Sequence, residues 1–348
     1  MAKSLNWKLW IGLLISVIFT YLAFRNVDFA RMWVVIRSAD LLFLFSIVAI
    51  TFFQFVIRAW RWDILLEPIK KTSFPDRLSS ILIGFAANCV LPARLGEFIR
   101  ANFMGQMEGI SGSSVFGTIV VERLFDGFTL LLVLLIGLMV TTFPTQWQSY
   151  AGALRGTGLF LFFAYILFTL FLMGFKYKAK PFLKLLDRLL FFLPRHVRGK
   201  VIDVIWNFSQ GLVLLRSPGK WVQGVFYSFL LWFSSLVQIH LAGHSIGLSL
   251  PFMATFLILG TASLGVMIPS APGFIGTFHL AVQYGFLFFG IGNEEALSAA
   301  ILWHAAMVPP TILFGLVAFL RLHLSVGELA EGSSISKGGG GDIQAHHL

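Results

Sequence analysis

The sequence has little charge and almost no cysteine. Only 12% of its 348 residues are charged, against about 25% in an average soluble domain. A soluble protein needs a charged, hydrated surface, so this composition excludes a soluble enzyme, a nucleic-acid-binding domain and a disordered chain. The single cysteine, Cys89, excludes an internal disulfide. The sequence also has no phosphate-binding loop, nucleophile elbow or cysteine cluster, so no catalytic residue, cofactor or metal site is predicted.

Long apolar runs take the place of charge. Hydrophobic residues make up 57% of the chain, and the mean hydropathy is +0.84. A hydrocarbon core about 30 Å thick is crossed by roughly 17–25 apolar residues in a helix, and backbone polar groups in lipid must be satisfied within the segment. We therefore predict an all-α polytopic membrane protein with about six full transmembrane helices. They cover residues 7–24, 41–57, 115–143, 159–175, 222–241 and 297–320.

Two further apolar regions, residues 78–91 and 252–268, each end at a break of the form P-x-x-x-G, and the apolar sequence resumes after the glycine. Proline ends a helix and glycine permits a tight reversal of the chain. Each region is therefore predicted to be a helix–break–helix re-entrant hairpin. The alternative is two ordinary proline-kinked pairs in an eight-span protein. The breaks are built from Pro92 and Gly96 in the first region and from Pro269, Pro272 and Gly273 in the second.

The positions of the basic residues predict the orientation in the membrane. The chain has a net charge of +10. Segments 58–77 and 176–220 are rich in Lys and Arg, which are in excess in cytoplasmic loops, so both segments and both termini are expected in the cytoplasm. Loop 25–40, which holds three arginines, is expected outside. Three full spans between the hairpins then place the hairpins on opposite faces. This arrangement predicts an inverted repeat with a binding site near the middle of the membrane.

The predicted organisation is a single membrane domain that covers residues 1–330. Its first repeat covers about 41–143 and its second about 222–320. Segment 176–220 mixes basic and apolar residues at helical spacing, which predicts an amphipathic connector on the inner leaflet. Residues 331–348 belong to a tail rich in Gly and Ser and are predicted to be disordered.

Charged residues inside a membrane are functional candidates, because each costs roughly 2.5–3.5 kcal/mol at the centre of the bilayer. The first such cluster lies in and around the first break. Its side chains, together with the helix ends that the break frees, suit a phosphate or another anionic headgroup. The alternative is an Arg–Glu pair that locks the hairpin. The cluster consists of Asn88, Arg94, Glu97 and Arg100.

Two more charged clusters lie in or next to predicted spans. Glu122 and Asp126 are four residues apart and so face the same side of a helix, with Arg123 between them. They are predicted to carry protons or to hold a cationic group; the alternative is an interhelical salt-bridge set. Residues 58–62, which include Arg61, combine Arg and Trp at the end of a span. This pattern indicates either an interfacial anchor or headgroup recognition.

The histidines give weaker signals. His240 and His244 have the zinc-helix spacing, but Leu241 stands where a metalloprotease needs Glu, so no metal is predicted there. His279 and His304, in the second hairpin and the last span, are either proton carriers or ordinary satisfied polar residues.

Four motifs together resemble a known family. They read R-x-W-R-W from residue 58, G-F-A-A-N-x-x-x-P-x-R-x-G-E-x-x-R from residue 84, E-R-x-x-D from residue 122 and P-x-x-P-G-x-x-G from residue 269. This set, within residues 7–320, resembles the lysylphosphatidylglycerol synthase transmembrane-domain family, also called flippase-like. The resemblance implies a bacterial or archaeal protein of the cytoplasmic (inner) membrane that moves or handles lipids.

The sequence also departs from that family. No hydrophilic stretch is long enough to encode the soluble synthase domain of the family's best-known members, so a stand-alone member is expected. In the second hairpin Phe274 and His279 stand where the family pattern has Gly and Glu. An acidic role is therefore not expected there, and His279 would supply a pH-sensitive group instead.

We expect a lipid translocase (a flippase-like transporter) rather than an enzyme. A phospholipid, an aminoacyl-lipid or a polyprenyl-phosphate lipid would cross through a polar cavity between the hairpins. The alternatives are a membrane-embedded glycosyl or lipid transferase and an accessory membrane subunit. The expected partners are membrane lipids, with a second copy of the chain or a lipid-modifying enzyme as further options. Nucleic acid is not an expected partner. The predicted substrate-binding residues are Arg94, Glu97, Arg100, Asn88, Arg123 and Arg61, and the predicted proton- or cation-coupling residues are Glu122, Asp126 and His279.

Overall fold

The protein is all-α in the part of the chain that the structure describes. The computed structural model describes residues 2–91, 94–143, 145, 148–177, 188–190, 198–199, 202 and 218–322. These residues form eleven α-helices and one 3-10 turn, and no strand. The predicted all-α class is confirmed. The predicted tail 331–348, most of the predicted connector 176–220 and Pro92 lie outside the described residues.

Five helices are long and apolar enough to cross a membrane. A sixth span is counted only if α1 (Ala2–Phe24) and α2 (Phe29–Arg37), which are bent by 88° to one another, form one broken span. The loop expected at 25–40 thus contains a helix, which begins where the side chain of Asp28 accepts hydrogen bonds from the first free N–H groups. The five long helices are α3 (Leu41–Leu66), α6 (Gly112–Val140), α7 (Gln148–Tyr177), α10 (Pro218–Ser245) and α13 (Asn293–Arg321).

Both predicted breaks separate pairs of shorter helices. The first lies between α4 (Phe74–Val90) and α5 (Gly96–Glu108), and the second lies between α11 (Ala254–Met267) and α12 (Thr277–Leu287). The second break contains the 3-10 turn η4 (Pro272–Phe274), in which Gly273 has a φ of 73°, a conformation that favours glycine. The helices of each pair pack against one another, and α4 also contacts η4.

The first hairpin enters and leaves the bundle at one end. The backbone N–H of Ser73, the N-cap of α4, donates to Glu108 at the end of α5 (2.8 Å), and Lys70 is ion-paired with the same carboxylate (3.1 Å). At this end Glu67, just after α3, is ion-paired with Lys220 near the start of α10 (2.8 Å). We call it the connector end.

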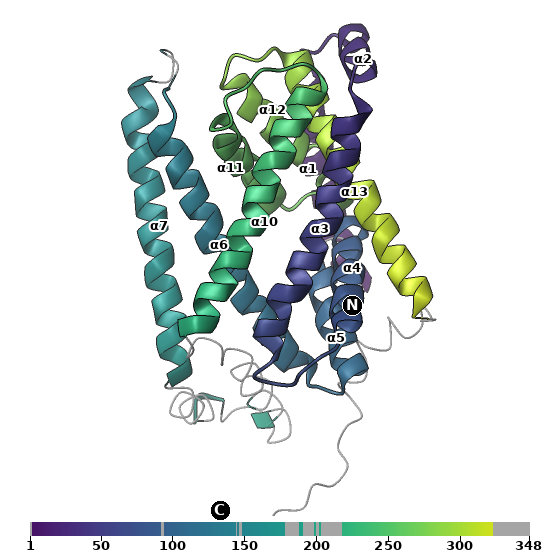
Figure 1. Ribbon diagram of the computed structural model, residues 1–348, viewed down its shortest axis with the longest axis vertical. Helices are drawn as coiled ribbons and strands as arrows, with labels where there is room; N and C mark the ends of the chain where they lie inside the picture. Colours follow the sequence, from purple (N-terminus) through teal and green to yellow (C-terminus); the bar gives the residue numbers. More distant parts are fainter. Residues whose placement is uncertain are drawn as a thin grey trace, which may run out of the picture.

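The second hairpin lies at the opposite end of the bundle (Figure 1). Asp40, before α3, donates its backbone N–H to Ser245 at the end of α10 (2.8 Å). Gln283 of α12 donates to the carbonyl of Ala23 near the end of α1 (3.2 Å). Among the described residues, three long helices lie between the hairpins in the chain, namely α6, α7 and α10, which agrees with hairpins at opposite ends.

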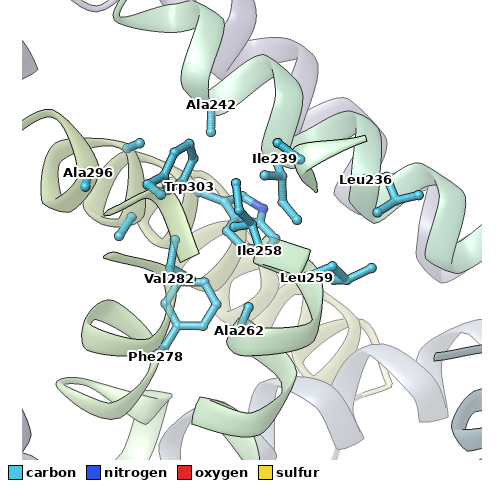
Figure 2. Close-up of a cluster of buried hydrophobic side chains, with 14 of the residues drawn as sticks. Leu236, Ile239, Ala242, Ile258, Leu259, Ala262, Phe278, Val282, Ala296 and Trp303 are labelled. Atoms are coloured by element: carbon cyan, nitrogen blue, oxygen red, sulfur yellow. The ribbon is translucent and has the colours of Figure 1, made fainter. Parts of the chain in front are cut away.

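The two larger of three hydrophobic clusters among the described residues surround the hairpins. One joins α3, α4, α5 and α6 around the first hairpin. The other joins α10, α11, α12 and α13 around the second, where Ile258, Phe278 and Trp303 interdigitate (Figure 2). Each hairpin therefore packs into a buried hydrophobic cluster of its own.

Candidate functional site

A cavity of about 380 Å³ lies where the two breaks meet. Its wall is mostly apolar and carries Asn88, Arg94 and Ser270 as polar side chains. The first hairpin, the second hairpin and α1 each contribute to it. The lining residues are Ile11, Gly12, Asn88, Leu91, Arg94, Val266, Met267, Ile268, Pro269, Ser270, Ala271, Pro272 and Phe274.

Arg94 joins the first break to the second hairpin. Its φ of 54° lies in the left-handed region, a strained conformation for a residue with a side chain. One guanidinium nitrogen donates to the carbonyl of Val266 (3.2 Å), next to the C-terminal residue of α11, where helix carbonyls lack partners. Among the described residues no carboxylate lies within ion-pair distance of Arg94, and its side chain lines the cavity.

Asn88 holds the first break in shape from the other side. Its side-chain oxygen accepts a hydrogen bond from the backbone N–H of Gly96 (2.8 Å), the first residue of α5. Gly96 is required there, because a methyl group at this position would overlap the main-chain oxygen of Gly84 on α4. Asn88 therefore fixes the start of α5 beside the cavity.

Helix α1 forms a third wall of the cavity, which the sequence does not predict. Ser16 accepts a hydrogen bond from the backbone N–H of Ala271 in the second break (2.8 Å). A Cβ at Gly12 would lie 3.1 Å from the carbonyl oxygen of Ser270, and Thr20 lies against Gly276. The spacing of Gly12, Ser16 and Thr20, four residues apart each time, is the small-residue signal that predicts close helix packing in membranes.

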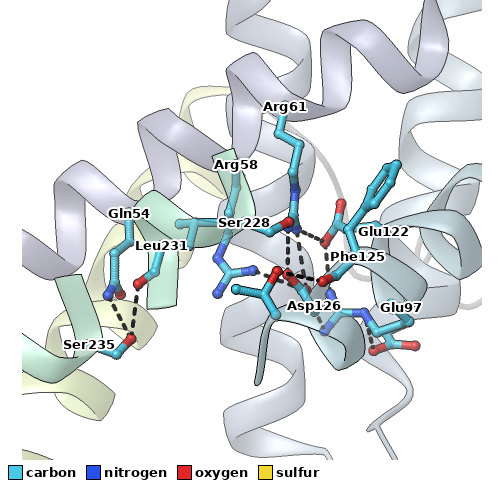
Figure 3. Close-up of polar contacts among 12 residues, drawn as sticks. Gln54, Arg58, Arg61, Glu97, Glu122, Phe125, Asp126, Ser228, Leu231 and Ser235 are labelled. Carbon is cyan, nitrogen blue, oxygen red and sulfur yellow. Dashed lines mark hydrogen bonds and ion pairs between the residues drawn. The ribbon is translucent and has the colours of Figure 1, made fainter. Parts of the chain in front are cut away.

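A buried charge network lies beside the first hairpin, between α3, α5, α6 and α10 (Figure 3). At its centre, Glu122 on α6 is fully buried and accepts two hydrogen bonds from Arg100 on α5 (3.0 and 2.9 Å). It is also ion-paired with Arg123 (2.8 Å) and with Arg61 on α3 (3.2 Å). One carboxylate thus receives three arginines.

Asp126, one helical turn further on α6, completes the network. Arg61 donates to it at 2.5 Å and also to the hydroxyl of Ser228 on α10 (2.6 Å). Arg123 (3.5 Å) and Arg58 (3.9 Å) lie further from the same carboxylate. Because buried charges are tolerated only when they are paired, this network ties the four helices together.

Aromatic contacts finish the packing of the arginines. The guanidinium of Arg100 lies 3.7 Å from the ring centroid of Trp62, and the indole N–H of Trp62 donates to Thr118 (2.9 Å). Arg61 and Trp62 are both fully buried, which is not the position of an interfacial anchor. Ser228 and Thr118 have no role that the sequence predicts, because no local pattern marks a partner on a distant helix.

The structure divides the six predicted substrate-binding residues into three pairs. Asn88 and Arg94 line the cavity, whereas Arg61 and Arg100 are buried in the network. The remaining two, Arg123 and Glu97, are ion-paired with each other at 3.6 Å, and their side chains are 36% and 22% exposed. The predicted coupling residues Glu122 and Asp126 also belong to the network.

The histidine pair lies at the second break. His304 on α13 donates to the carbonyl of Gly273 (2.7 Å), since a carbonyl only accepts. Nδ1 of His279 accepts from the backbone N–H of Gly276 (3.4 Å), and the two imidazole rings are 4.6 Å apart. Both rings thus hold the break in place, and the coupling role of His279 stays a prediction.

The chain is similar to archaeal membrane proteins over most of their length. A UPF0104 membrane protein of Pyrococcus horikoshii is 22% identical over 303 residues, which cover 83% of this chain and 90% of the relative. Two UPF0104 membrane proteins of Methanothermobacter thermautotrophicus are 22% identical over 283 residues (76% of this chain, 81% of the relative) and 23% identical over 272 residues (74% and 77%). No solved structure matches the chain.

The match to a protein family covers most of the chain. The model of the lysylphosphatidylglycerol synthase TM region matches residues 9–315, which include both hairpins, the cavity and the charge network. The membrane region of these synthases is the part without the catalytic domain. The chain is accordingly a multi-pass membrane protein that belongs to the lysylphosphatidylglycerol synthase TM region family.

Proposed function

We propose that the protein is a lipid translocase that passes a phosphate-bearing headgroup through the cavity between the two breaks. The observation that carries the proposal is Arg94, a cation without a carboxylate partner in the described part of the chain, on the wall of that cavity. Arg94 is exposed, so a ligand can reach it, and a guanidinium binds phosphate oxygens through charge-assisted hydrogen bonds. The start of α5 beside it adds the positive end of a helix dipole.

The edge of the cavity suits a lipid. Ile11 is 44% exposed and Met267 69% exposed, and both line the cavity. In a membrane protein, exposed apolar side chains face hydrocarbon. A headgroup held at Arg94 would therefore leave its tails in the bilayer, which a water-soluble substrate does not require.

Transport follows from the contact between the hairpins. The hydrogen bond from Arg94 to Val266 is a polar link between the first hairpin and the second. A phosphate that binds Arg94 competes with the Val266 carbonyl and frees α11 to shift. We propose that the two halves form an inverted repeat and that one half moves against the other, which exposes the cavity to each leaflet in turn.

Transport in reconstituted vesicles tests the proposal. Full-length protein is inserted into phosphatidylcholine vesicles that contain fluorescent phosphatidylglycerol, and a membrane-impermeant quencher reports the fraction in the outer leaflet over time. Wild type is expected to move the lipid faster than empty vesicles, and Arg94→Ala is expected to lose most of that rate.

Arg155→Ala is the matched control. Arg155 also donates to a main-chain carbonyl, that of Leu138 (3.0 Å), but it does not line the cavity. Its substitution is expected to keep the wild-type rate. Equal rates for Arg94→Ala and Arg155→Ala would refute the role of Arg94, and no transport by the wild type would refute the function.

A further inference from the structure

The wall of the cavity carries charge of one sign. Arg94 is the cationic side chain among the described lining residues, and no Asp or Glu is among them. The two positions of the first break that the structure does not describe are Pro and Ala in the sequence, so neither adds a charge. A headgroup in this cavity meets a guanidinium, amide and hydroxyl groups and apolar side chains.

The carboxylates near the cavity are already bound. Glu97, three residues after Arg94, is ion-paired with Arg123 (3.6 Å). Glu122 is fully buried beneath three arginines, and Asp126 accepts from Arg61 at 2.5 Å. In this region four arginines, including Arg58, face three carboxylates, so a cationic group would find no carboxylate that is free of an arginine among these three.

We infer that the cavity accepts a lipid headgroup that carries a phosphate and no cationic group, and that it rejects an aminoacylated headgroup. This inference rests on the proposed transport function and narrows its substrate. An aminoacyl lipid would bring an ammonium group next to Arg94 and a network with excess positive charge. Placing like charges together is unfavourable and is one way in which a site excludes the wrong ligand.

The size of the cavity agrees with a small headgroup. Its volume of about 380 Å³ is near the lower limit of ligand sites, which range over about 300–1,000 Å³. A phosphate with a short polar substituent fits within that space beside Arg94. The apolar wall formed by residues such as Leu91 and Phe274 offers no hydrogen-bond partner to an added amino acid.

Transport selectivity tests the inference. Wild-type protein is reconstituted at one density into vesicles that contain fluorescent phosphatidylglycerol, fluorescent lysylphosphatidylglycerol or a fluorescent polyprenyl monophosphate. We expect the two lipids without a cationic group to move at least about tenfold faster than the lysyl lipid. Lysylphosphatidylglycerol moving at the same rate or faster would overturn the inference and leave the transport function standing. No movement of any of the three would overturn both.

A charge-reversal variant gives an independent result. Arg94→Glu is expected to transport phosphatidylglycerol more slowly and the lysyl lipid faster than wild type. The ratio of the phosphatidylglycerol rate to the lysyl-lipid rate should therefore fall at least about tenfold. Arg155→Glu, a reversal outside the cavity, is expected to keep the wild-type ratio. If Arg94→Glu does not fold, Arg94→Gln should still bring the two rates closer together. An unchanged ratio in the folded Arg94 variant would overturn the inference.

A soluble phosphate is separated from a lipid headgroup by competition. Inorganic phosphate added to both sides of the vesicles is expected to leave the rate of phosphatidylglycerol movement unchanged, because it lacks the tails that the exposed edge of the cavity accommodates. Inhibition by millimolar inorganic phosphate would overturn the inference that binding in the cavity requires the lipid tails.

Discussion

Replacing Glu122 by glutamine should destabilise the protein more than any other single neutralisation in the charge network. Glu122 is fully buried and is ion-paired with Arg61, Arg100 and Arg123. Glutamine has nearly the same shape and keeps one hydrogen-bond acceptor, but it removes the negative charge. The variant therefore tests electrostatics with little change in packing.

The expected cost follows from the partners that each arginine keeps. Arg61 and Arg123 both retain Asp126. Arg100 retains no carboxylate among the described residues and becomes a buried, unneutralised cation. Removing one partner of a buried ion pair costs about 3–5 kcal/mol. At roughly 2 °C per kcal/mol, the apparent Tm of Glu122→Gln should fall by about 6–10 °C.

Intrinsic tryptophan fluorescence during heating in detergent measures the change. The control is Glu67→Gln, because Glu67 is also ion-paired but is exposed. Its hydrogen bond with Lys220 lowers the pKa of the Glu67 carboxyl. This control should shift the Tm by about 2 °C at most. A fall in Glu122→Gln no larger than in the control would refute the reasoning.

A second substitution identifies the stranded cation. If Arg100 accounts for most of the loss, adding Arg100→Gln to Glu122→Gln should restore part of the Tm, because it removes the charge that lost its partner. The two effects should then be clearly non-additive. If the two losses of Tm simply add, Arg100 and Glu122 are not energetically coupled, and the prediction is wrong.

Two further substitutions test the hairpins. Gly96→Ala should lower the Tm by several degrees, because the new methyl group overlaps the main-chain oxygen of Gly84, whereas Gly156→Ala meets nothing within 4 Å and should not lower it; a larger fall in the second variant would contradict the packing. His304→Phe should leave the carbonyl of Gly273 unpaired, at a cost of about 1–3 kcal/mol, and speed amide hydrogen exchange in the second break by about fivefold or more; unchanged exchange there would show that this hydrogen bond does not hold the break.

The positions of the hairpins could be predicted from local chemistry. Proline and glycine impose their backbone preferences wherever they occur, so the sequence places the second break at Pro269–Gly273, and the structure has α11 ending at Met267. The number of crossings between the hairpins then fixes their entry from opposite ends. Neither inference needs knowledge of a distant contact.

The end of α3 and the charge network could not be predicted in the same way. The predicted span stops at Ile57 because charged residues follow, but the helix continues to Leu66. Those charges are tolerated because Asp126 and Ser228, far along the chain, neutralise or hydrogen-bond them. A pattern read along one helix cannot show which face meets a partner on another. For the same reason the sequence groups Arg94 with Arg100, although one faces the cavity and the other Glu122.

The ion pair between Arg61 and Asp126 has a consequence for how the protein is made. Their positions differ by 65 residues, which a ribosome adding about 5–20 residues per second takes roughly 3–13 s to synthesise. During that interval α3 carries an arginine without this partner, although Arg61 lies in the last quarter of the helix and not at its centre, where a charge costs roughly 2.5–3.5 kcal/mol. The pair between α3 and α6 can therefore form only after the whole first hairpin has been synthesised, so the hairpin is already present when the network closes beside it.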